Sequence, residues 1–161
     1  MKHYPPPHPS TAPRLKRRRI PAFHPVPVSP RKDGWTPMRQ AEFIGYLAQY
    51  RCVERAARSV SMGKESAYRL RRRPGAAGFA AAWDAAMGRG LMDGRPGVRP
   101  VEYVDLASTK STDLPLHYRA QAGLVQVMLK NGRYVGSRWK DDINAILRLA
   151  HRLRNVGEEQ T

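Results

Sequence analysis

Two short apolar stripes between residues 53 and 72 limit the possible folds of this chain more than any other feature. The first stripe has the three- and four-residue spacing of one helix face and consists of Val53, Ala56, Ala57 and Val60. After a break at 61–63, Ala67 and Leu70 form the inner face of a second short helix over residues 64–72. Because small side chains let two helices cross closely, the pattern predicts a helix-turn-helix.

Two further helices are expected around this motif. Thr36 is a suitable N-cap and Pro37 suits the first helical position, so a helix should begin there and run to about Tyr50. A helix over residues 76–87 should follow the motif, with a large apolar stripe formed by Phe79, Trp83 and Met87. We therefore expect a bundle of four helices over residues 35–90, which is small but large enough to fold.

The C-terminal part should form a β-hairpin and one helix after an irregular linker at residues 91–122. Asn131-Gly132 lies between two apolar runs and predicts a tight hairpin turn. A regular apolar face then predicts a final helix within a unit spanning residues 123–156. This unit buries little surface alone, so it must pack on the helical domain, another copy of the chain or a partner. We favour self-association, through Ile143, Ile146, Leu147 and Leu153.

The charge of the chain predicts a polyanionic partner, with nucleic acid foremost. Lysine and arginine number 29 against 13 acidic residues, giving a net charge of +16. Nine of the 14 prolines lie in residues 1–30, where they prevent regular secondary structure, so residues 1–34 are predicted to form a flexible arm. Its basic residues are Arg14, Lys16, Arg17, Arg18 and Arg19. Residues 91–161 carry 11 basic and eight acidic residues, a near balance that suits protein contacts better than DNA.

The helix over residues 64–72 is the predicted DNA-reading element, because the corresponding helix of this motif enters the major groove. Its outward positions are Lys64, Glu65, Tyr68, Arg69 and Arg72. Basic side chains can contact guanine edges and a glutamate can accept from the cytosine amine. Neighbouring arginines are predicted to contact phosphates, namely Arg51, Arg55, Arg58, Arg71 and Arg73. The arm should add contacts to phosphates or to a minor groove.

Other chemistry has little support in the sequence. The single cysteine, Cys52, excludes an intramolecular disulfide, and no pair of histidines has the spacing of metal ligands. We therefore expect no catalytic residues, no metal and no cofactor, and a protein that is not an enzyme. No apolar run approaches the roughly 18–20 residues of a membrane span. A cytoplasmic, nucleoid-associated protein that does not bind membranes is expected.

Two stretches carry a resemblance to a known family. Ala56-Ala57-Arg58 and the run Ser66-Ala67-Tyr68-Arg69-Leu70-Arg71, followed by a helix bearing Trp83, resemble the homeodomain-like helix-turn-helix of bacterial and phage proteins. They are most similar to proteins related to the small subunit of phage terminases. The family usually has glycine opening the turn and serine or threonine capping the reading helix, where this chain has Ser61 and Gly63.

The main hypothesis is sequence-selective binding of double-stranded DNA in transcriptional regulation, by a homo-oligomer that contacts the transcription machinery. One alternative, implied by the resemblance, is a subunit that recognises DNA for packaging and docks on the packaging machinery. Further alternatives are a nuclease or recombinase accessory protein and an RNA-binding protein.

Overall fold

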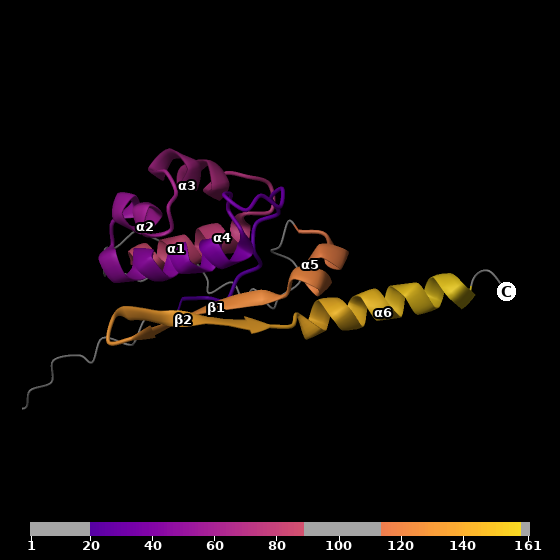
Figure 1. Cartoon of the computed structure of the whole chain (residues 1–161). Helices are drawn as coiled ribbons and strands as arrows, with labels where there is room; N and C mark the ends of the chain where they lie inside the picture. Colours follow the sequence, from indigo (N-terminus) through magenta and orange to yellow (C-terminus); the bar gives the residue numbers. More distant parts are fainter. Residues whose placement is uncertain (1–19, 89–113, 159–161) are drawn as a thin grey trace, which may run out of the picture.

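The computed structural model describes residues 20–88 and 114–158 and has the predicted mainly helical fold (Figure 1). The elements in chain order are α1 (Pro37–Tyr50), α2 (Val53–Ser59), α3 (Lys64–Arg71), α4 (Ala77–Met87), α5 (Leu116–Ala122), β1 (Leu124–Lys130), β2 (Arg133–Lys140) and α6 (Ile143–Glu158). Three layers are visible, with α2 and α3 on one side of α1 and α4 and the hairpin on the other (Figure 1). Helix α6 extends away from these layers and packs against α5.

Helix α1 is the centre of the fold. It begins where expected, since the Thr36 hydroxyl accepts a hydrogen bond from the Arg39 N–H at 3.3 Å. Its inner face buries Phe43 completely. The Phe43 ring lies 4.9 Å from the ring of Trp83 and 6.0 Å from that of Phe79, both on α4. The aromatic stripe of α4 therefore covers the helical core as predicted.

The turn between α2 and α3 accommodates Ser61 and Gly63 at the positions where the related family has glycine and a capping serine or threonine. Ser61 adopts the left-handed conformation that favours glycine, with φ 58°. Gly63 is the N-cap of α3 and offers no side chain to it. Instead, the Ser66 hydroxyl donates to the Gly63 carbonyl at 2.7 Å and accepts from the Trp35 indole N–H at 3.2 Å. The start of α3 is thereby tied to the loop that precedes α1.

The hairpin packs on the helical domain, which answers one of the questions that the sequence left open. Its strands are antiparallel, and Asn131 and Gly132 take positive φ values of 52° and 77° in the turn. On its inner face, Val125 and Val127 are buried in the same core as α1. The Tyr134 ring lies directly over Gly45 of α1, where an added Cβ would come within 2.2 Å of Tyr134 Cδ2. Glycine is required there for the close approach of helix and strand.

Residues 20–28 belong to the folded core, so the predicted arm boundary at residue 34 is too far along the chain. Ile20, Phe23 and Val26 are buried. Phe23 pairs with Val125 at the free edge of β1, through backbone hydrogen bonds of 3.0 and 2.8 Å. This segment, called segment 20–28 below, adds apolar side chains to the core, although its prolines suggest an irregular and exposed stretch. The basic residues at 14–19 lie outside the described residues.

Gln40 of α1 holds segment 20–28 in place. Its side-chain oxygen accepts from the Val26 N–H at 2.7 Å, and its amide donates to the carbonyls of Val26 and Trp35 at 3.1 and 3.0 Å. The side chain is completely buried, so these bonds compensate for its removal from water. These contacts also supply hydrogen-bond partners to the proline-rich backbone, which in a regular strand would come from a neighbouring strand.

Helix α5 corrects the prediction of an irregular linker up to residue 122. Residues 116–122 are helical, beginning after Pro115 and ending at Gly123, which has φ 66°. Tyr118 on this helix donates to the Pro25 carbonyl at 2.9 Å. The helix therefore connects segment 20–28 to the C-terminal unit. The rest of the predicted linker, residues 89–113, lies outside the described residues.

Candidate nucleic-acid interface

Helix α3 exposes most of the side chains that were predicted to read DNA. Ala67 and Leu70 are buried against the bundle and orient the helix. Its outward side chains are all exposed and comprise Lys64, Glu65, Arg69 and Arg72, with Arg73 directly after them. No described carboxylate forms an ion pair with these four basic side chains. Their charges are thus available to a ligand on one surface.

Tyr68 differs from the other predicted reading residues. It is half-buried, and its ring lies 5.3 Å from the ring of Trp83 on α4. The ring therefore helps to pack α3 on α4. Only its exposed part could touch a ligand, so Tyr68 is better described as a packing residue at the edge of the surface.

Arg71, which was predicted to contact phosphates, is engaged by a carboxylate on α4. Its guanidinium donates two hydrogen bonds to the Asp84 carboxylate, at 2.8 and 2.9 Å, and lies 5.5 Å from the centre of the Trp83 ring. In this ion pair Nη2 alone contacts both carboxylate oxygens; it joins α3 to α4 and offsets the arginine charge. No local pattern indicates this ion pair, because Asp84 lies 13 residues later on another helix.

Three of the arginines predicted to contact phosphates lie on α2 or just before it, and all three are exposed. Arg51 ends α1 in a left-handed conformation, and Arg55 stacks 4.1 Å from the centre of the Tyr50 ring. Arg58 pairs with Glu54 at 2.9 Å, but both side chains are largely exposed, so the pair is weak and easily exchanged for a phosphate. Residues 51–73 contain eight basic and two acidic residues, a net charge of +6. A surface of this composition suits a polyanion.

The predicted oligomerisation residues all lie on the exposed side of α6. Ile143, Leu147 and Leu153 are 65%, 63% and 67% exposed, and Ile146 is 41% exposed. The opposite side of the helix packs through Ala145, which is completely buried. An apolar stripe is therefore open to solvent on the helix that extends from the body (Figure 1).

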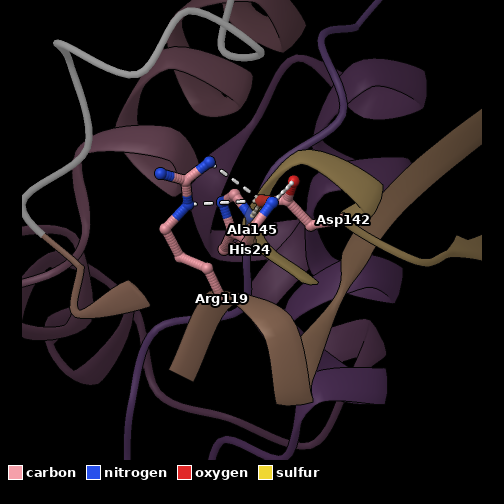
Figure 2. A network of polar contacts seen from close by, with 4 residues as sticks. All are labelled: His24, Arg119, Asp142 and Ala145. Atoms are coloured by element: carbon pink, nitrogen blue, oxygen red, sulfur yellow. Dashed lines mark hydrogen bonds and ion pairs between the residues drawn. The ribbon is translucent and has the colours of Figure 1, made fainter. Parts of the chain in front are cut away.

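A buried polar cluster that the sequence did not reveal joins three distant segments (Figure 2). Asp142 Oδ2 accepts from His24 Nε2 at 2.8 Å and from the Arg119 guanidinium at 2.9 and 3.2 Å, and Oδ1 accepts from the Ala145 N–H at 3.0 Å. All three side chains are at least 95% buried. Because the groups satisfy one another and are closed to solvent, we assign the cluster a structural role. It fixes segment 20–28, α5 and the start of α6 together.

The cluster shifts the pKa values of its members. Burial lowers the pKa of His24 below 6.5, although the hydrogen bond and the charge of Asp142 oppose this. Burial alone would raise the pKa of Asp142, but hydrogen bonds from Ala145, His24 and Arg119, with the arginine charge, bring it below the ordinary value. The cluster thus contains an ionised aspartate and a neutral histidine near pH 7. Elsewhere, burial raises the pKa of Tyr118 and Tyr134.

Comparisons with protein-family models, with curated proteins and with solved structures found no match. Among residues 20–88 and 114–158, no helix is both long and apolar enough to cross a membrane. The same residues contain no group of three or more histidine, cysteine, aspartate or glutamate side chains that could hold a metal ion. The geometry of α3 and its surroundings is therefore the main guide to function.

Proposed function

We propose that the protein binds double-stranded DNA with sequence selectivity through α3, and that it serves transcriptional regulation at the nucleoid as a binding protein, not an enzyme. One observation carries the proposal. Helix α3 is held by buried Ala67 and Leu70, while Lys64, Arg69 and Arg72 are exposed and pair with no carboxylate of residues 20–88 or 114–158. A helix that is rigid on one side and cationic on the other suits insertion into a major groove.

The residues divide into two roles in this proposal. Lys64 and Arg69 contact base edges, where an arginine can donate two bonds to guanine, and Glu65 accepts from a cytosine amine. Five exposed arginines contact phosphates, namely Arg51, Arg55, Arg58, Arg72 and Arg73. Five neutralised phosphates give a log–log slope of binding against salt of roughly −4.5, at about −0.9 for each phosphate.

Binding of labelled duplexes, measured by fluorescence anisotropy at several salt concentrations, tests the proposal. Arg69→Ala should weaken binding to a selected site by about 1–3 kcal/mol and relax base preference at one position. Arg31→Ala, in the exposed loop before α1, is a matched control and should leave both the affinity and the base preference unchanged. A flat salt dependence, or full affinity in a variant lacking both Lys64 and Arg69 side chains, would show that α3 does not read DNA.

We further propose that α6 pairs with α6 of a second copy of the chain. An antiparallel pair with two-fold symmetry places Ile143 opposite Leu153 and brings Leu147 close to the axis. It also sets the basic last turns of one helix, with Arg152, near the exposed Asp141 of the other copy. Such a dimer would present two α3 helices to two half-sites.

Mass measurement by light scattering tests this pairing. Leu147→Glu should give monomers, whereas Asn144→Glu adds the same charge beside the stripe and should leave the assembly intact. An assembly of eight or more subunits would instead favour the DNA-packaging alternative. Equal competition by duplex RNA would favour the RNA-binding alternative over DNA.

A further inference from the structure

The outer face of the hairpin is a second cationic surface. Lys130, Arg133, Arg138 and Lys140 are all exposed, and residues 123–140 contain no acidic residue. The near balance of charge over residues 91–161 conceals this, because six of the eight acidic residues lie before residue 114 or after residue 157. Within residues 123–156 there are seven basic and two acidic residues, and Asp142 is already engaged by Arg119.

The strand register places these charges on one side. Lys130 pairs with Arg133 and Gln126 with Arg138, whereas the intervening Val125 and Val127 point into the core. Successive residues of a strand alternate between faces, and the register shift between Met128 and Leu129 inserts one extra residue of β2 between Arg133 and Arg138. Arg133, Arg138 and Lys140 therefore lie on the same face as Lys130, pointing away from α1. Like charges directly opposite each other destabilise a hairpin, so folding does not account for the Lys130–Arg133 pair. Binding of an anionic ligand accounts for this pair.

The shape of this surface favours duplex DNA as that ligand. A two-stranded ribbon can enter a major groove of about 12 Å width or lie along its phosphates. Gln126 lies between the basic side chains as a neutral donor and acceptor, and Met128 beside it is 37% exposed. The face thus combines phosphate-binding charges with groups able to touch base edges.

This surface and α3 lie on opposite sides of the molecule, separated by α1 and α4 (Figure 1). Packed layers are spaced by about 10 Å each, so α3 and the hairpin are centred roughly 20 Å apart and their outward faces are farther apart still. This exceeds the Debye length of about 8 Å at physiological salt. Two duplexes could therefore be held at once without strong mutual repulsion, whereas a straight duplex could not touch both faces.

We propose that the outer face of the hairpin binds a second DNA duplex, so that one protein molecule bridges two DNA segments. The hairpin contact stands on its own residues, and the bridging rests on the proposed function of α3. A bead-bound duplex and a free fluorescent duplex provide the assay, since the fluorescent duplex is captured only when both are bound. We expect capture by the unmodified protein and by Leu147→Glu, in which paired copies cannot supply two α3 helices.

The decisive variant is Lys130→Gln, Arg133→Gln and Arg138→Gln combined. All three positions are exposed and the variant removes the opposed Lys130–Arg133 charges, so the unfolding temperature should not fall. Capture should fall at least tenfold, and binding of a single duplex through α3 should remain. Unchanged capture would overturn the proposal, as would loss of capture in Leu147→Glu. If Lys64→Gln with Arg69→Gln still binds a single duplex fully while the hairpin variant does not, the hairpin surface stands and the proposed role of α3 fails.

Discussion

Replacement of Asp142 by alanine should be among the most destabilising single changes in the C-terminal half of the protein. The carboxylate is 5% exposed and accepts from His24, from Arg119 twice and from the Ala145 N–H. Without it, Arg119 would keep a buried charge with no partner. Removing one member of a buried pair reduces the free energy of unfolding by about 3–5 kcal/mol. For a chain of this size, each kcal/mol lowers Tm by about 2–4 °C, so we expect a loss of roughly 10 °C.

Urea denaturation followed by circular dichroism, with a thermal scan, measures this effect. Asp141→Ala removes the neighbouring exposed carboxylate and should change stability by less than about 0.5 kcal/mol. A double variant, Arg119→Met with Asp142→Leu, should be more stable than Asp142→Ala, because it leaves no unpaired buried charge. If Asp142→Ala loses less than about 1 kcal/mol, or if the double variant is the less stable of the two, the cluster does not hold the fold as described.

Three further changes test other contacts. Burial lowers the pKa of His24 below 6.5, so the unfolded chain takes up a proton at a higher pH than the folded protein does. The stability contributed by the neutral ring is therefore present above pH 6.5 and lost as pH falls toward the folded-state pKa. His24→Gln should accordingly flatten the fall in urea midpoint between pH 7 and pH 5. Gly45→Ala should reduce the free energy of unfolding by about 1–3 kcal/mol, because its Cβ would overlap the Tyr134 ring; unchanged stability in urea would contradict this packing. Gln40→Leu leaves the buried Val26 N–H without its acceptor and should lower stability by about 1–3 kcal/mol, measured in the same way.

Local patterns predicted the elements whose signals lie within a few residues. The alanine spacing located α2 and α3, and Asn131-Gly132 located the hairpin turn. The exposed side of α3 followed from the same spacing, because burial of Ala67 and Leu70 determines which side chains face solvent. These features depend on helix and strand periodicity alone, so they can be predicted from the sequence of this chain without information on distant contacts.

Contacts between distant residues could not be predicted in this way. Segment 20–28 has no periodic pattern, and its order depends on Val125 and Gln40, which no local signal connects to it. The ion pair of Arg71 with Asp84 likewise links two helices whose relative placement the sequence does not give. Proline content indicated an irregular backbone correctly, but an irregular backbone can still be buried when its polar groups find partners.

Segment 20–28 also determines when the fold can be completed. His24 meets Asp142 across 118 residues, whereas Val26 meets Gln40 across only 14. Closing the longer loop costs about 2 kcal/mol more in chain entropy, and contacts of such separation slow folding. During synthesis the helical bundle can form early, but Phe23 and His24 must wait until β1 and the start of α6 have emerged. Completion of the fold therefore requires contacts between segment 20–28 and residues more than 100 positions later in the chain.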